Sequence, residues 1–151
     1  MLEEGSRFPE FSLPDQDDKP VTLKDLAGAP AVVYFYPKDD TTGCTMEACD
    51  FQERLPSIPG VRVIGISPDS TAKHRKFRAK YNLEFTLLAD EEHSFVEQIG
   101  LWVEKKLYGR PYMGVARTTV MLDADGMIKH VWRNVNPKGH AEEVLADLQR
   151  I

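Results

Sequence analysis

The sequence feature that most restricts the fold is an unbroken apolar run over residues 31–36, which ends at Pro37. Such a run, rich in β-branched and aromatic side chains, is typical of a strand buried on both faces of a sheet. A second run of this kind covers residues 61–67. Between the two, apolar side chains recur at helical spacing from Cys44 to Leu55, so the pattern predicts a helix that connects two buried strands.

The remainder of the chain also divides into strands and helices. The expected elements are a hairpin over 11–22, a helix from a Ser70 cap to Tyr81, a strand over 85–89, a short helix over 94–99, a hairpin over 118–132 and an amphipathic helix over 140–151. Residues 101–116 contain glycine and proline and are expected to form a loop. This order predicts a single α/β domain over residues 1–151, in which a central mixed sheet of five strands is flanked by helices on both faces.

Composition and charge argue against several classes of function. The chain has 151 residues, of which 42% are hydrophobic, and a net charge of -5. Nucleic acid and anionic membranes attract basic surfaces, so neither is expected as a partner. The sequence has no apolar run of about 18 residues and begins without a basic-then-apolar leader, so we expect neither a membrane span nor secretion. The expected location is the reducing cytoplasm, where two cysteines are more often redox-active than permanently bridged.

Cys44 stands where the predicted helix begins, shortly after a buried strand. Unpaired backbone N–H groups and the positive end of the helix dipole meet at such a position, and both favour a thiolate over a thiol. Gly43 has no side chain and is expected to leave room for a substrate to approach the backbone. The position therefore indicates a nucleophilic cysteine.

Cys49 follows five residues later, on a different side of the same predicted helix. At about 100° per residue, Cys44 lies on the apolar stripe and Cys49 about 140° away from it. In an ideal helix the two Cα atoms are about 8.7 Å apart, whereas a disulfide needs roughly 4.4–6.8 Å. The pair is therefore expected to bond only when the first helical turns unwind. On spacing alone, two unrelated cysteines, one of them in the core, remain an alternative.

Other uses of cysteine and histidine fit the sequence less well. The C-x-x-C spacing of a disulfide reductase is absent, and neither a second cysteine pair nor a nearby histidine completes a zinc site. The four histidines show no ligand spacing, so no metal is expected. A nucleotide-binding motif is also absent, and we expect no cofactor. The basic run over residues 73–80 is interpreted as a solvated helix face, with the attraction of an acidic partner as the alternative.

The segment from Tyr34 to Cys49, Tyr-Phe-Tyr-Pro-Lys-Asp-Asp-Thr-Thr-Gly-Cys-Thr-Met-Glu-Ala-Cys, closely resembles the active-site segment of peroxiredoxins. It is most similar to the Q-type group, also called bacterioferritin comigratory proteins. Further matching segments extend the resemblance over nearly the whole chain, at 8–15, 65–67, 85–90 and 117–119. Thr42 departs from the pattern, because this group usually has proline there. The resemblance implies a thioredoxin-like fold with an added N-terminal β-hairpin.

The resemblance also implies a thiol peroxidase that reduces hydrogen peroxide and alkyl hydroperoxides. Cys44 matches the cysteine that attacks one peroxide oxygen and becomes a sulfenic acid, and Cys49 matches the cysteine that resolves it as an intramolecular disulfide. Thr41 matches the hydroxyl that positions the peroxide, and Arg117 the guanidinium that steadies the thiolate and the developing oxyanion. The implied reductant is thioredoxin or a similar dithiol donor, and the implied oligomeric state is a monomer.

Two weaker matches complete the site implied by the resemblance. Pro37 matches a residue that shields the pocket, and Glu47 an acidic position in the network of the arginine. Several of these residues also have a purely structural interpretation. Thr41 is a natural helix N-cap, Pro37 a natural strand terminator, and Arg117 by itself resembles a surface arginine at the start of a strand.

Two other classes of function remain alternatives at this point. One is a redox sensor or holdase that uses the same cysteine switch to expose surface. The other is a degenerate thioredoxin-fold binding module, against which the joint presence of Thr41, Cys44 and Arg117 counts.

Overall fold

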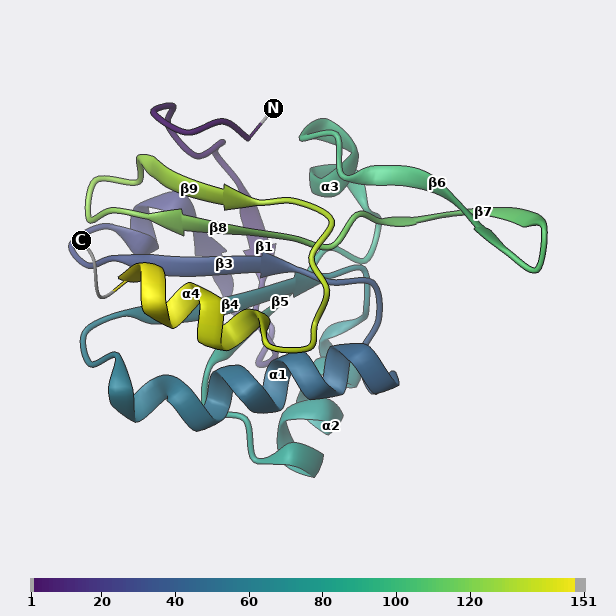
Figure 1. Ribbon diagram of the computed structural model, residues 1–151, viewed down its shortest axis with the longest axis horizontal. Coiled ribbons are helices and arrows are strands. Elements are labelled where there is room, and N and C mark those ends of the chain that lie inside the picture. The colour runs from purple at the N-terminus through teal and green to yellow at the C-terminus, as the bar shows by residue number, and fades with distance from the viewer. Residues whose placement is uncertain (1, 149–151) are drawn as a thin grey trace.

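The computed structural model describes residues 2–148 and is built around a mixed sheet of five strands in the order β5-β4-β3-β8-β9 (Figure 1). These strands are β3 (Ala31–Phe35), β4 (Arg62–Ser67), β5 (Thr86–Ala89), β8 (Thr118–Leu122) and β9 (Ile128–Trp132). β3 pairs in parallel with β4 and antiparallel with β8. The first apolar run of the sequence is therefore the central strand, and the predicted mixed sheet is confirmed.

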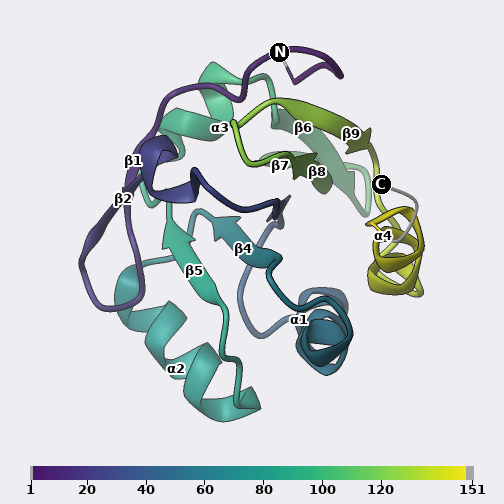
Figure 2. The same ribbon diagram turned by 90° about the vertical axis from the view of Figure 1, so that its left-hand side faces the viewer.

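Helices cover both faces of this sheet, as predicted (Figure 2). The elements on one face are α1 (Thr42–Arg54), α2 (Thr71–Tyr81) and α4 (His140–Leu148), and those on the other are α3 (Ser94–Gln98) and the 3-10 helix η1 (Leu23–Leu26). Alternation along β3 sends Val33 toward α3 and Tyr34 toward α1. Every residue of β3 is buried, because both of its faces are covered. Among residues 2–148, no helix is long and apolar enough to cross a membrane.

The boundaries of the smaller elements follow local sequence signals. The N-terminal hairpin pairs β1 (Ser12–Pro14) with β2 (Pro20–Thr22), and the 3-10 helix η2 (Leu55–Ser57) follows α1 at a proline. The Ser70 hydroxyl caps α2 by accepting a 3.2 Å hydrogen bond from the Lys73 backbone N–H. Asn82 ends this helix in the left-handed conformation, with φ 53°. The last helix begins at His140 as expected, and its predicted end at 149–151 lies outside the described residues.

Residues 101–116 are not a loop, and the prediction of one is wrong. They form an antiparallel ribbon, β6 (Trp102–Leu107) and β7 (Arg110–Val115), which projects from the body of the protein (Figure 1). Its turn residues, Tyr108 and Gly109, both have positive φ, 52° and 77°, as a type I′ turn requires. The sequence signal is weak, because tyrosine replaces the usual asparagine or aspartate and Pro111 lies inside a strand.

The register between β3 and β8 determines which segments meet at the C-terminal end of β3. Phe35, the last residue of β3, pairs with Thr118, the first residue of β8. Arg117 directly precedes β8 and so lies beside the loop that leads into α1. Its carbonyl oxygen accepts a 3.0 Å hydrogen bond from the Val135 N–H, which ties the β9–α4 loop to the same edge. One end of the sheet thus gathers four chain segments around the start of α1.

Candidate active site

Cys44 lies in the first turn of α1 and is 1% exposed. It packs in one apolar cluster with Ala48 and Phe51, so the stripe predicted from the spacing is the buried face of the helix. Backbone N–H groups of the first helical turn have no partner within the helix, and the helix dipole adds positive charge there. The sulfur therefore lies in an environment that favours a negative charge.

Arg117 brings a fixed cation to this sulfur from 73 residues away in the chain. Its Nη2 donates to Sγ of Cys44 at 3.2 Å, and its Nη1 donates to Oε1 of Glu47 at 2.8 Å. Burial acts to lower the pKa of Arg117, but the charges of Glu47 and Cys44 outweigh it and the pKa is raised. The side chain is only 15% exposed, so the interpretation of Arg117 as a surface arginine is wrong.

Glu47 is a fully buried carboxyl whose second oxygen, Oε2, has no hydrogen-bond partner among the described residues. Burial raises its pKa to about 7, against the lowering effect of Arg117. The nearby phenol of Tyr34 is also buried without a partner in the described chain, and burial followed by the charge of Glu47 holds its pKa well above the usual range. The site thus contains a carboxyl whose charge changes close to neutral pH.

This burial predicts a specific pH dependence of stability. The folded protein holds the Glu47 proton more tightly than the unfolded chain does. The protonated carboxyl therefore contributes to the stability of the fold below pH 4.5, and this contribution is lost as the pH rises through about 7. A Glu47→Gln variant is neutral throughout. The difference in unfolding free energy, variant minus unsubstituted protein, should therefore rise by about 3 kcal/mol when the pH is raised from 4 to 8.

Urea denaturation at the two pH values measures this difference. The effects of the other titrating groups on the unfolding free energy are common to both proteins and cancel in the comparison. Glu53→Gln, on the exposed side of the same helix, is the matched control. If Glu47→Gln changed the unfolding free energy equally at both pH values, the buried ionisation described here would be refuted.

Cys49 lies on the flank of α1 and is partly buried. Burial, then the charges of Asp50 and Glu53, raise the pKa of its thiol. Both cysteines are free thiols, and α1 is continuous from Thr42 to Arg54, so the helical separation of about 8.7 Å between their Cα atoms applies. Cys49 is therefore neither close enough nor acidic enough to react with Cys44 in this conformation.

Thr41 and Gly43 differ in detail from what their positions predict. Thr41 occupies the N-cap position, but its hydroxyl donates to the Lys38 carbonyl oxygen at 3.0 Å instead of capping the helix. Side-chain capping therefore does not explain this threonine. A Cβ on Gly43 would lie 3.2 Å from Pro137 and 3.5 Å from Nη2 of Arg117, so protein atoms occupy the space expected for a substrate. A side chain here would have an ordinary contact with Arg117 and a tight one with Pro137, which would have to shift by a few tenths of an ångström.

Pro37 lies two residues after the end of β3 and is partly buried. This position agrees with both interpretations of Pro37, as a residue that ends the strand and as one that shields a pocket. The catalytic assignments of Pro37 and Thr41 stay predictions.

Lys105 is a further charged residue of this region that the sequence did not indicate. Burial and the charge of Arg117 lower its pKa, and the charge of Cys44 acts in the opposite direction, so it lies within electrostatic reach of both. It belongs to β6, in the segment predicted as a loop. The order of apolar and polar residues along this strand gave no clear signal for it.

A second buried polar cluster holds the loop between β3 and α1. The Tyr36 hydroxyl donates to Oδ1 of Asp39 at 2.5 Å, and the Asp39 N–H donates to Oδ2 of Asp69 at 2.8 Å. Nδ1 of His74 lies 2.6 Å from Oδ2 of Asp39, and its Nε2 lies 3.0 Å from the Leu88 carbonyl oxygen. The cluster contains side chains of the kinds that bind metal ions, namely Asp39, Asp69 and His74. Their polar atoms already form hydrogen bonds within the cluster. We therefore assign the cluster to positioning the loop.

Comparison with known proteins gives consistent matches over most or all of the chain. A family model described as the AhpC/TSA family matches residues 5–131. Peroxiredoxin Bcp of Escherichia coli (strain K12) is 44% identical over 146 residues, which make up 95% of this chain and 94% of that protein. The solved structure of PrxQ from Xylella fastidiosa has a TM-score of 0.92 and 31% identity, and the match covers 99% of this chain and 97% of that one.

A further solved structure bears on the chemistry. It is the bacterioferritin comigratory protein of Xanthomonas campestris, described in terms of its alkyl peroxide reduction activity and trapped as an intermediate or ligand complex. It has a TM-score of 0.85 and 36% identity, over 93% of this chain and 90% of that one.

Proposed function

Because this chain belongs to the AhpC/TSA family and is a peroxiredoxin, we propose that it reduces hydrogen peroxide and organic hydroperoxides by a cycle of Cys44 and Cys49. The observation that carries the proposal is the hydrogen bond from Nη2 of Arg117 to Sγ of Cys44. A buried thiol at a helix start gains little from a guanidinium unless its reaction develops negative charge there.

The first half of the cycle is a displacement at oxygen. The thiolate of Cys44 attacks one peroxide oxygen, the S–O bond forms, and the O–O bond breaks. The other oxygen leaves with the electron pair of the broken bond, takes a proton, and is released as water or an alcohol. Arg117 stabilises this developing charge, and Glu47 holds the guanidinium in place through Oε1. Thr41 and Pro37 border the helix start, where they position and shield the peroxide.

The second half of the cycle needs a local change of conformation. Cys49 attacks the sulfenic sulfur, the S–S bond forms, and water leaves. The separation along α1 forbids this bond while the helix is intact, so the first turns must unwind. Unwinding also exposes Cys49 to solvent and so relieves the burial that contributes most to raising the pKa of its thiol.

A thioredoxin-type dithiol then supplies two electrons and restores both thiols. The proposed setting is the reducing cytoplasm, where such donors are kept reduced. We propose that the chain acts as a monomer, because both cysteines belong to one helix and the disulfide closes within one chain.

Mass spectrometry of the peroxide-treated protein tests this cycle. We expect an intramolecular Cys44–Cys49 disulfide in the unsubstituted protein, and a sulfenic acid on Cys44 in a Cys49→Ser variant. With excess thioredoxin, the unsubstituted protein should turn over many equivalents of peroxide, whereas Cys49→Ser should stop after about one, because no disulfide is formed for the donor to reduce.

Cys44→Ser is the control and should show neither product. An unsubstituted protein that consumed one equivalent of peroxide and no more in the presence of thioredoxin would be a sensor, not an enzyme. Oxidation of Cys49 in preference to Cys44 would reverse the assigned roles.

A further inference from the structure

The β6–β7 ribbon leaves its large apolar side chains in solvent. Tyr108 is 97% exposed, Leu107 59%, Met113 49% and Tyr112 48%. These side chains therefore contribute little to the core of the protein. Exposed apolar side chains that gather on one projecting element indicate a contact surface.

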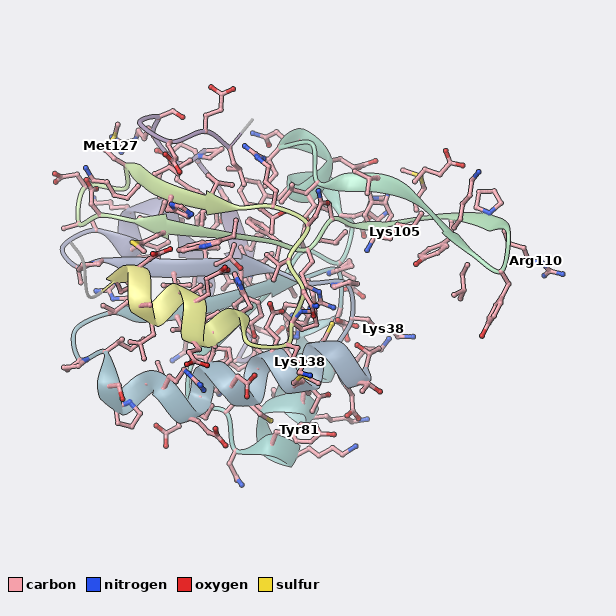
Figure 3. All side chains as sticks on the ribbon, in the orientation of Figure 1. Lys38, Tyr81, Lys105, Arg110, Met127 and Lys138 are labelled. Carbon is pink, nitrogen blue, oxygen red and sulfur yellow. The ribbon has the colours of Figure 1, made fainter. Side chains whose placement is uncertain are left out.

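One face of the ribbon turns toward the active site. Strand pairing sets Lys105 opposite Tyr112 and Leu107 opposite Arg110, and these four side chains share a face. Lys105, at the root of the ribbon, lies within electrostatic reach of both Arg117 and Cys44, so this face begins beside the active site. Figure 3 shows Lys105 near the root of the ribbon and Arg110 at its far end. The face thus extends an apolar and basic wall outward from the site.

The charge of this region is opposite to that of the whole protein. The ribbon carries three basic side chains, Lys105, Lys106 and Arg110, against one acidic side chain, Glu104. The net charge of the ribbon is +2, whereas the net charge of the whole chain is -5. The pocket beside the β3–α1 loop is mixed in charge, because its lining combines four lysines with three aspartates: Lys38, Lys73, Lys76 and Lys80 with Asp39, Asp40 and Asp69. The clear excess of positive charge therefore lies on the ribbon, and it is complementary to an acidic partner.

We propose that the β6–β7 ribbon is the docking surface for the protein dithiol that reduces the Cys44–Cys49 disulfide, and that this partner is acidic around its thiols. The proposal rests on the cycle proposed above. A partner thiolate must reach a sulfur at the start of α1, so its surface must meet the elements that border this helix end. The partner thiolate attacks one sulfur, the S–S bond breaks, and a mixed disulfide forms. Its second thiol then releases both cysteines as thiols and leaves the partner oxidised by two electrons.

The residues of the ribbon favour a protein partner over the other candidates. Tyrosine, methionine and arginine are enriched at the centres of protein interfaces. If a second copy of this chain bound through the same ribbon, two basic ribbons would face and repel each other. In a membrane-binding loop the apolar side chains gather at the tip, whereas here only Leu107 and Tyr108 lie there, and Tyr112 and Met113 lie back along the strands.

The experiment compares two reductants in steady-state peroxide turnover. One ribbon variant combines Lys106→Glu with Arg110→Glu, and the other combines Leu107→Ser with Tyr108→Ser. The control combines Lys24→Glu with Lys129→Glu, which makes the same charge change at two exposed positions outside the ribbon. With thioredoxin as the probe, each ribbon variant should lose about tenfold in kcat/KM for the reductant, as expected for loss of interface anchor residues. With dithiothreitol, all variants should keep the unsubstituted rate.

The dependence on salt gives a second readout. Raising the ionic strength should slow thioredoxin-driven turnover of the unsubstituted protein, and the charge-reversed ribbon variant should lose this dependence. Unchanged kcat/KM for thioredoxin in both ribbon variants would overturn the proposal. So would a loss of dithiothreitol-driven turnover in these variants, which would place the ribbon in the peroxide step, or binding to phosphatidylglycerol vesicles that the ribbon substitutions abolish. An unsubstituted protein inactive with dithiothreitol would instead refute the catalytic cycle itself.

Discussion

Replacing Arg117 with methionine is expected to slow the second-order reaction with hydrogen peroxide by about 10²–10³-fold, as loss of one preorganised charge-stabilising donor does in other enzymes. The guanidinium donates to Sγ of Cys44 and is fixed by Glu47, so it is in place before charge develops. Methionine fills a similar volume without charge or donor. Rapid-mixing kinetics under single-turnover conditions, with no reductant present, measure this step alone.

Two matched variants separate catalysis from packing. Arg117→Lys keeps the charge but loses the planar fork that reaches sulfur and carboxylate together, so it should recover only part of the rate. Arg117→Met combined with Glu47→Gln removes the buried carboxyl that the single substitution leaves without its cation, and this double variant should be more stable but no faster. If Arg117→Met reacted at the unsubstituted rate, the guanidinium would have no part in the peroxide step.

Oxidation to the Cys44–Cys49 disulfide is expected to abolish the amide protection of the first turns of α1. In the reduced protein these amides belong to a continuous helix that packs on α4 and the sheet. Closing a disulfide over five residues requires the Cα atoms to approach by about 2 Å or more, which a helix does not permit. Hydrogen exchange of residues 45–50 should therefore accelerate on the order of 10³-fold, as for local structure whose opening free energy falls close to zero.

The exchange of α2 is the internal control, because this helix lies outside the redox-active segment and should keep its protection. Cys49→Ser treated with peroxide separates the two chemical events. It can form the sulfenic acid but not the disulfide, and its α1 amides should stay more protected than those of the disulfide form. Equal protection of residues 41–52 in the reduced and disulfide forms would show that no unwinding is needed.

Much of the fold could be predicted from periodicity, because its core elements carry strong signals. The apolar run over residues 31–36 contains the central strand, Ala31–Phe35, and Ser70 and Asn82 bracket α2 at the predicted positions. The prediction failed at the β6–β7 ribbon, and the reason is physical. It has no buried face, so its residues show no clear alternation of apolar and polar types, and its turn has tyrosine where a type I′ turn usually has asparagine or aspartate.

The site could be predicted only in part, because local position and long-range contact are different kinds of information. The inward direction of Cys44 follows from helical spacing alone. The contact between Cys44 and Arg117 depends on the pairing of Phe35 with Thr118, a register that no local pattern reveals. The packing of Pro137 over Gly43 likewise depends on the path of the β9–α4 loop. The resemblance to peroxiredoxins supplied Arg117 as a candidate, and the sheet register explains why it arrives at the sulfur.

The pairing of β3 with β8 has a consequence for the folding chain. Cys44 and its guanidinium are 73 residues apart in sequence, and contacts of such separation form late because loop closure must precede them. Until β8 docks against β3, the thiol lacks its hydrogen bond from Arg117. The contact between the Cys44 sulfur and the Arg117 guanidinium therefore requires completion of the sheet, and a chain still being synthesised lacks it until residue 117 and β8 have been made.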